Sequence, residues 1–262
     1  MYDVNYHKAD SVADAASKLS EDAQLLSGGQ TLIPTMKARL ASPDALIDVS
    51  GIAEMKVISN GGGSVTIGAA VTHAEVAGSD AVASAIPALA ALAGGIGDPA
   101  VRHRGTIGGS VANNDPAADY PAACLGLGAT IITNNREIAA DDFFVGLFET
   151  ALEDGEIITG VRFPVPAKAG YAKFPNPASR YALVGVMVAE TDSGVRVAVT
   201  GAGEDGVHRS ADLEAALSAE WSEASAGGVS VGTDGVLSDM HGDASYRAHL
   251  VTVMAKRAVA AA

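Results

Sequence analysis

The chain has 262 residues, of which 48% are apolar, and its 17 basic and 31 acidic side chains give a formal charge of −14. This acidity excludes a nucleic-acid-binding protein, because phosphate backbones are recognised by clustered Lys and Arg. The apolar content excludes a disordered chain, and the length allows one large domain or two ordinary ones. The single cysteine, Cys124, excludes a disulfide framework, a thiolate zinc site and an iron–sulfur cluster held by this chain alone.

Nothing in the sequence predicts a membrane span or an export signal. The longest uncharged stretches, residues 81–97 and 120–135, are interrupted by Pro and Gly. Both fall short of about 20 consecutive apolar residues. The start, MYDVNYHKAD, lacks the apolar core of a signal peptide. We therefore expect a cytoplasmic protein.

Short alternating elements are predicted up to about residue 164. Residues 11–19 favour a helix with Ser11 as N-cap and Asp14 as its capping-box acid. Asp115 suits the N-cap of another helix, with Pro116 at its first position. The remaining helices and strands are expected as follows: helices at 32–40, 81–93 and 116–125, and strands at 23–26, 45–49, 65–69, 129–133 and 156–163, with a glycine turn at 61–63 between the strands at 45–49 and 65–69.

The pattern changes near residues 164–170, where Pro164 and Pro166 follow the strand at 156–163. Beyond this point, strands are expected at 181–190 and 195–200 around a turn, and helices at 212–217 and 246–260. The sequence therefore predicts an α+β protein of two domains, residues 1–166 and 167–262.

A first glycine loop lies between a predicted strand and a predicted helix. It consists of Ser27, Gly28, Gly29, Gln30 and Thr31, and the helix begins at Leu32. Adjacent glycines let an anion approach backbone N–H groups, and a helix N-terminus favours phosphate. The same residues are also typical of an ordinary strand-to-helix turn, so both interpretations stay open at this point.

A second loop repeats the combination of hydroxyls and paired glycines. It consists of Thr106, Ile107, Gly108, Gly109 and Ser110, directly after the basic residues 102–104. Two such loops can hold a diphosphate from two sides through backbone N–H groups. The basic residues either help to neutralise that charge or form a solvated surface turn.

Other motifs carry less chemistry. Asp119 can accept hydrogen bonds from ribose or ribityl hydroxyls, although alone it is also typical of a solvated helix acid. Residues 201–206 (GAGEDG) match G-x-G-x-x-G, but no helix follows directly and two acids lie within them, so we expect a loop. Cys124 is expected in the core. Because no general acid or base is evident, redox chemistry would belong to a cofactor.

Together, three segments resemble the FAD-binding medium subunit of the molybdenum hydroxylases, the family of xanthine dehydrogenase and carbon monoxide dehydrogenase. They are residues 27–52, 97–123 and 173–188. The resemblance implies a FAD-binding fold of the vanillyl-alcohol-oxidase (PCMH) type over residues 1–166, with two α/β subdomains divided near 50–60. A C-terminal α+β domain follows over residues 167–262.

The resemblance also implies roles for individual residues. Diphosphate contacts are implied for Ser27, Gly28, Gly29, Gln30, Thr31 and Leu32 and for Thr106, Ile107, Gly108, Gly109 and Ser110. Asp119 would bind FAD hydroxyls, Ile158 and Ile96 would contact the cofactor, and Lys173 would lie near the flavin ring. Ser110 departs from the Asn common in the family, and FPNPASR replaces a basic pair found in many members.

In the family, substrate reacts at a molybdenum–pterin centre in a large subunit. Electrons then cross two iron–sulfur clusters of the 2Fe–2S type in a small subunit and reach FAD, which passes them to an external acceptor. The resemblance thus implies both partner subunits, assembled as a dimer of heterotrimers. Two alternatives stay open: a stand-alone flavin oxidase of the same fold, and a non-catalytic nucleotide-binding module.

Overall fold

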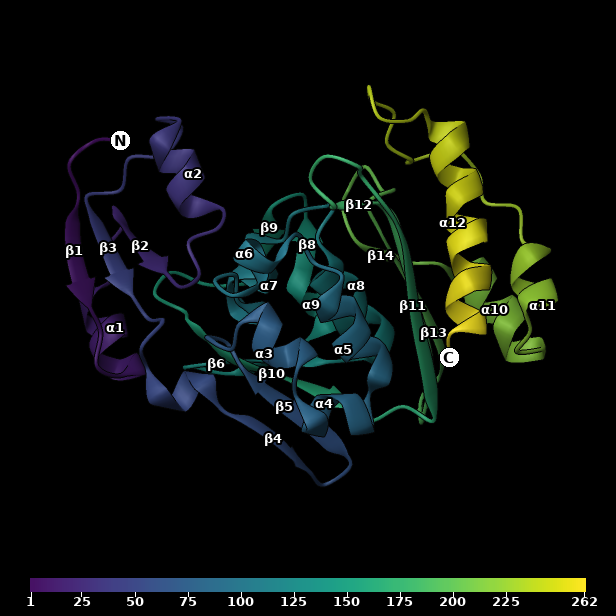
Figure 1. The fold of residues 1–262 in the computed structure, drawn as a ribbon, viewed down its shortest axis with the longest axis horizontal. Coiled ribbons are helices and arrows are strands. Elements are labelled where there is room, and N and C mark those ends of the chain that lie inside the picture. Colours follow the sequence, from purple (N-terminus) through teal and green to yellow (C-terminus); the bar gives the residue numbers. More distant parts are fainter.

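The first of three main sheets is small and parallel in the computed structural model, which describes residues 1–262 (Figure 1). Its strand order is β1-β3-β2, with β1 at Asn5–Lys8, β2 at Ala23–Leu26 and β3 at Ala45–Asp48. The helices α1 (Val12–Lys18) and α2 (Leu32–Lys37) connect these strands. Parallel strands end together at one sheet edge, so the first glycine loop emerges at an edge where α/β folds bind ligands.

The second sheet is antiparallel and forms the centre of the molecule (Figure 1). Its order is β4 (Ile58–Gly61), β5 (Ser64–Gly68), β10 (Ile158–Pro164), β6 (Thr130–Thr133) and β7 (Glu137–Ala139). The strands expected at 45–49 and 65–69 therefore do not flank one turn. The hairpin at Gly62 and Gly63, both with positive φ, joins β4 to β5 instead, and residues 45–48 belong to the first sheet.

Short helices and a small hairpin surround this sheet. They are the 3₁₀ helix η1 (Ala53–Lys56), α3 (His73–Ala77), α4 (Asp80–Ala85), α5 (Pro87–Gly94), α6 (Pro99–Arg102), α7 (Ile107–Asn113), α8 (Asp119–Leu127) and α9 (Ala140–Phe143), with the strands β8 (Phe144–Gly146) and β9 (Glu149–Thr150).

Two helix predictions are wrong in their bounds. The single helix expected at 81–93 is two helices, broken at Ile86 (φ −140°, ψ 75°), because Pro87 disfavours helical geometry in the residue before it. The helix expected from Pro116 begins at Asp119. Asp115 therefore caps no helix, and its carboxylate accepts a hydrogen bond from the Ala117 N–H at 2.9 Å in a local turn.

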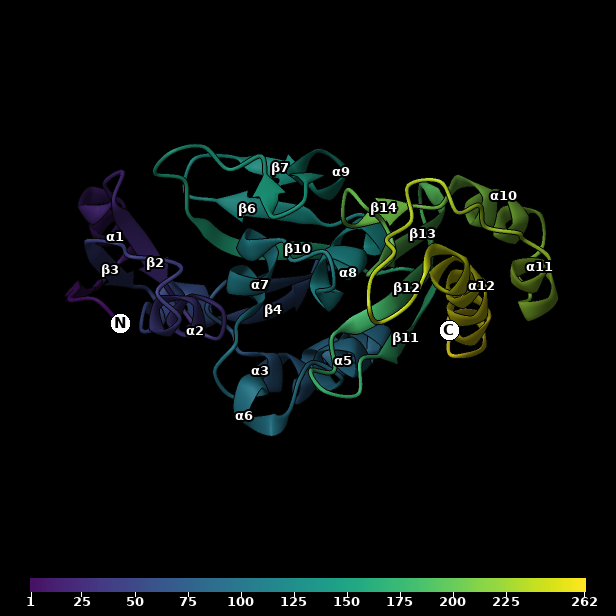
Figure 2. The same ribbon diagram turned by 90° about the horizontal axis from the view of Figure 1, so that it is seen from above.

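The third sheet has the antiparallel order β11-β12-β13-β14. Its strands are β11 (Lys168–Pro175), β12 (Ala182–Thr191), β13 (Gly194–Thr200) and β14 (His208–Arg209), followed by α10 (Ala211–Ala219), α11 (Glu223–Gly227) and α12 (Ala244–Ala260). Figures 1 and 2 show the sheet between the central helices and α12. The hairpin expected around residues 192–194 is confirmed, and residues 201–206 form a loop.

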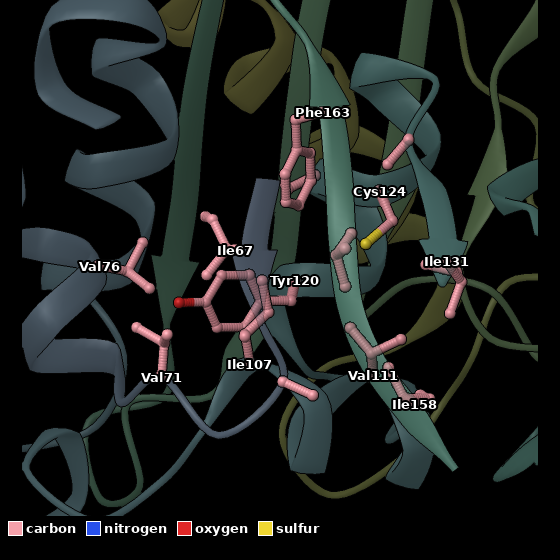
Figure 3. Packing of buried hydrophobic residues seen from close by; sticks show 14 of the residues in the cluster. Ile67, Val71, Val76, Ile107, Val111, Tyr120, Cys124, Ile131, Ile158 and Phe163 are labelled. Carbon is pink, nitrogen blue, oxygen red and sulfur yellow. The ribbon is translucent and has the colours of Figure 1, made fainter. Parts of the chain in front are cut away.

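The main core lies between the central sheet and α7 and α8, where Tyr120 and Phe163 are fully buried (Figure 3). Cys124 belongs to this core as expected, and burial raises the pKa of its thiol well above the usual range. A second core fills the space between the third sheet and α12. None of the helices combines the length and the apolarity needed to cross a membrane.

Candidate cofactor-binding site

Both glycine loops line one cavity of about 640 Å³, a size typical of small-molecule and cofactor sites. Two of the residues expected at a cofactor do not line it: Ile107 is fully buried in the core, and Lys173 lies behind Asp119. The expected residues that do line it are Ser27, Gly28, Gly29, Gln30, Thr31, Leu32, Ile96, Thr106, Gly108, Gly109, Ser110, Asp119 and Ile158.

The first loop presents backbone donors that the chain itself does not use. The N–H groups from Gly28 to Leu32 have no acceptor within the protein. Gly29 adopts φ +69°, a conformation that side chains rarely tolerate. At Gly28 a Cβ atom would lie 2.2 Å from the carbonyl oxygen of Arg104, so this glycine lets the first loop approach the segment that leads into the second. Consecutive free N–H groups are suited to an anion such as a diphosphate.

The second loop differs, because its N–H groups from Ile107 to Ser110 are already hydrogen-bonded. Those of Ile107 and Gly108 donate to backbone carbonyls at residues 71 and 69, at 3.1 and 2.9 Å. Those of Gly109 and Ser110 donate to the Thr106 side chain at 3.2 Å and the Thr106 carbonyl at 3.0 Å. The expectation that both loops offer free backbone donors therefore holds for the first loop and fails for these four residues of the second.

A hydrogen bond joins the two loops directly. The hydroxyl oxygens of Ser27 and Thr106 are 3.0 Å apart, although the residues are 79 positions apart in the sequence. Gly109 is open toward the cavity, since a Cβ atom there would meet only the Thr106 hydroxyl, at 3.0 Å. The second loop thus supplies a rigid wall and hydroxyl groups.

The basic residues 102–104 do not line the cavity. Arg102 instead donates to the carbonyls of Ile96 and Gly97, both at 3.0 Å, and fixes that turn. The cation in the cavity wall is Arg180, which has φ +63° and lies between Ser179 and Tyr181, two further lining residues. Sequence reasoning missed these three, and the only local signal was the turn-forming Asn-Pro at 176–177.

Asp119 is buried, with 4% of its surface exposed, which excludes a solvated helix acid. Its Oδ1 accepts a hydrogen bond from the Tyr171 hydroxyl at 2.6 Å, and its Oδ2 accepts one from Lys173 Nζ at 3.1 Å; Lys173 Nζ also forms an ion pair with Oδ1 at 2.9 Å. Burial raises the pKa of Asp119, while Lys173 and Tyr171 oppose that shift by stabilising the carboxylate. The negative charge of Asp119 is therefore balanced by Lys173, which does not line the cavity.

Two further titratable side chains in the cavity wall were not anticipated. Glu156 is held by Arg136, with Nε 2.9 Å from its Oε1, and this hydrogen bond lowers the pKa of Glu156 to about 2. His73 is 5% exposed, and burial, followed by the nearby Arg102, lowers its pKa to about 4. His73 is therefore neutral and Glu156 ionised at neutral pH.

Residues 2–166 match the family model described as "FAD binding domain in molybdopterin dehydrogenase". The chain belongs to this family. Among its relatives are the carbon monoxide dehydrogenase medium chain of Afipia carboxidovorans, 37% identical and covering 97% of this chain and 95% of the relative, and the nicotine 6-hydroxylase medium subunit of Paenarthrobacter nicotinovorans, 37% identical and covering 98% and 96%.

The fold also matches that of solved structures in this FAD-binding family. A chain of the carbon monoxide dehydrogenase from Hydrogenophaga pseudoflava that lacks the Mo-pyranopterin moiety superimposes with a TM-score of 0.89 at 35% identity, covering 100% of this chain and 97% of that one. A chain of the quinoline 2-oxidoreductase from Pseudomonas putida 86 superimposes with a TM-score of 0.90 at 29% identity, covering 99% and 96%.

The residues present fit the FAD of this family. The unpaired N–H groups of residues 28–32 suit a diphosphate, the cavity volume suits a large ligand, and Ile96 and Ile158 add apolar surface to its wall. Asp119 places a buried carboxylate in the same wall, where it can accept hydrogen bonds from hydroxyl groups.

Proposed function

We propose that this chain is the FAD-carrying medium subunit of a heteromeric molybdenum hydroxylase. It receives electrons from iron–sulfur clusters in a small subunit, while substrate reacts at a molybdenum–pterin centre in a large subunit. Bound FAD supplies the redox chemistry that passes these electrons to an external acceptor. The observation that carries the proposal is the row of free N–H groups at residues 28–32, set in one cavity with a buried carboxylate, in a chain of this family.

The relatives support a division of labour between subunits. A medium chain of a carbon monoxide dehydrogenase and a medium subunit of a nicotine 6-hydroxylase are equally similar to this chain, at 37% identity each. Substrates as different as these do not share one pocket, so substrate choice belongs to another subunit. The lone, buried Cys124 agrees with this, because a chain with one cysteine holds no iron–sulfur cluster.

Each part of the cavity has a task in this proposal. The first loop, residues 27–32, binds the diphosphate through backbone N–H groups, and Thr106 and residues 108–110 form the adjoining wall. Asp119 accepts hydrogen bonds from FAD hydroxyls, and Ile96 and Ile158 contact the cofactor. Lys173 acts from behind Asp119. It lies close to the turn at Gly95, where an added Cβ atom would be 3.9 Å from the Lys173 Cε. No side chain of this chain transfers a proton to substrate.

We extend the proposal to organisation. Residues 1–166 form the FAD-binding domain, divided near residues 50–60, and residues 167–262 form a C-terminal domain. The change of sheet after β3 and again after β10 supports these divisions. The assembly is a dimer of heterotrimers in the cytoplasm, which the mass of the complex purified from the native source and cell fractionation will test.

Reconstitution tests the function. The isolated chain should bind one FAD and show a flavin spectrum, yet turn over no hydroxylase substrate until the large and small subunits are added. Turnover by the isolated chain would support a stand-alone oxidase instead. A chain that binds no FAD, alone or in the complex, would leave only a nucleotide-binding module.

A further inference from the structure

Three polar side chains form a buried cluster behind the cavity wall: Asp119, Lys173 and Tyr171, termed the Asp119 cluster. Asp119 lies at the first position of α8, whereas Tyr171 and Lys173 lie two residues apart on β11. Residues two apart on a strand share a face, so β11 directs both donors at one carboxylate. Of the three, only Asp119 lines the cavity.

The two carboxylate oxygens of Asp119 accept hydrogen bonds from different donors. Oδ1 accepts a hydrogen bond from the Tyr171 hydroxyl at 2.6 Å, and Oδ2 accepts one from Lys173 Nζ at 3.1 Å, while the same Nζ forms an ion pair with Oδ1 at 2.9 Å. An ionised carboxylate has about four acceptor positions. Both oxygens therefore keep capacity for a further donor, and the two existing hydrogen bonds fix the orientation of the carboxylate.

A glycine on the neighbouring strand makes room for the tyrosine hydroxyl. Gly185 on β12 pairs with Lys173. A Cβ atom at Gly185 would lie 2.5 Å from the Tyr171 hydroxyl oxygen and 3.2 Å from its Cζ. Real Cβ atoms do not approach oxygen so closely, so the reach of Tyr171 to Asp119 depends on this missing side chain.

We propose that Tyr171 is a positioning residue for FAD binding: its hydroxyl holds Oδ1 of Asp119 and so fixes the orientation in which this carboxylate accepts a hydrogen bond from a FAD hydroxyl. The inference rests on the proposed function, in which Asp119 contacts FAD. Tyr171 itself does not line the cavity and acts only through Asp119.

The charge state of Asp119 gives the inference a specific signature. The titratable neighbours of Asp119 are Lys173 and Tyr171 from β11, Tyr120 on its own helix, and Tyr181. The pKa of Tyr181 is also raised by the charge of Asp115. The pKa values of the three tyrosines are raised, so all three stay neutral in an assay between about pH 4 and 8. Loss of the Tyr171 hydroxyl removes a group that lowers the pKa of Asp119, so the carboxylate protonates at higher pH.

The test is FAD titration of the full chain, followed by flavin fluorescence, for wild type and Tyr171→Phe. We expect a Kd about tenfold higher at pH 7 in the variant. We also expect the loss of affinity on acidification to begin at higher pH than in wild type. A merely structural role of Tyr171 would not move this pH profile.

Two companion variants make the result decisive. Tyr6→Phe removes another tyrosine hydroxyl that donates to an aspartate, Asp48, but neither residue lines the cavity, so affinity should not change. Gly185→Ala keeps the Tyr171 hydroxyl and displaces it, and should raise Kd in the same direction as Tyr171→Phe. Thermal unfolding identifies the folded variants to be compared.

Asp119→Asn separates this inference from the proposed function. If wild type binds FAD and Asp119→Asn weakens binding, wild-type affinity and pH profile in Tyr171→Phe would overturn the role of Tyr171 alone. If Asp119→Asn binds FAD as well as wild type does, the proposed contact between Asp119 and FAD is wrong, and so is the role of Tyr171. Absence of FAD binding by wild type would instead overturn the proposed function.

Discussion

The two glycine loops have similar sequences, SGGQT and TIGGS, but they expose different chemistry. The N–H groups of the first have no acceptor in the chain, whereas those from Ile107 to Ser110 in the second are hydrogen-bonded within it. The second loop opens a helix that packs on β5, where a Cβ atom at Gly108 would lie 2.5 Å from that of Ala69. The first loop leads into a helix whose N-cap, Thr31, makes no side-chain cap.

The difference shows that a glycine pair has two separate uses. In the first loop the absent Cβ atoms clear the way for a ligand to backbone donors. In the second, one glycine allows close packing and the other opens the wall to the cavity. Variants that affect one use and not the other test this division.

Gly28→Ala should have the largest effect, because its Cβ would overlap the Arg104 carbonyl oxygen at 2.2 Å and force the loops apart. We expect FAD affinity to fall about 100-fold and the free energy of unfolding to fall by about 4 kcal/mol. FAD titration and urea unfolding measure the two effects. Gly61→Ala is the matched control, since nothing lies within 4 Å of its added Cβ. Equal behaviour of the two variants would show that the loops are not in contact.

Acidification should lower the free energy of unfolding through protonation of His73, which contacts Gly105 directly before the second loop. The backbone N–H of His73 donates to the Gly105 carbonyl at 2.9 Å, and the imidazole ring packs against Gly105. Its pKa falls from 6.5 to about 4 on folding, because burial disfavours the charged ring. The unfolded chain therefore takes up a proton first as pH falls, and this contribution to stability is complete above pH 6.5 and lost by about pH 4.

The size of the histidine effect follows from that shift and is about 3 kcal/mol. Urea unfolding at several pH values should show it as the difference between wild type and His73→Gln, a variant that cannot titrate. Other groups, including Asp119 and Glu156, titrate in both proteins and cancel in the comparison. Parallel pH profiles for the two proteins would contradict a buried, neutral His73.

Gly108→Ala and Gly109→Val should separate packing from binding within the second loop. Gly108→Ala should lower the free energy of unfolding by about 2 kcal/mol, because its Cβ meets Ala69. Gly109→Val should reduce FAD occupancy, raising Kd about tenfold, with a smaller loss of stability, because its side chain enters the cavity wall. Thermal unfolding without FAD and titration with FAD measure each. Undiminished FAD binding in folded Gly109→Val would remove the second loop from the site.

The sequence alone located both loops and Asp119 because their signals are local: paired glycines beside hydroxyls, and an acid close behind. It did not reveal that Ala69 and Val71 take the N–H groups of the second loop, since these partners lie more than 30 positions away. Strand β11 was missed because KAGYAKFP has no apolar run, although it carries two members of the Asp119 cluster. The positions of the helices were better predicted than their ends, as at Ile86, where Pro87 breaks the expected helix in two.

The smallest predicted effect concerns the one hydrogen bond that couples the loops, between the Ser27 and Thr106 hydroxyls. Ser27→Ala should lower the free energy of unfolding by about 1 kcal/mol. Thr106→Ala should cost more, because this hydroxyl also accepts the Gly109 N–H as the N-cap of α7. In the Thr106→Ala background, Ser27→Ala should cause no further loss of free energy of unfolding, because the hydroxyl that pairs with Ser27 is absent. A double-mutant cycle by urea unfolding measures this coupling, and strict additivity of the two changes would mean that the first loop is held by the Gly28 contact alone.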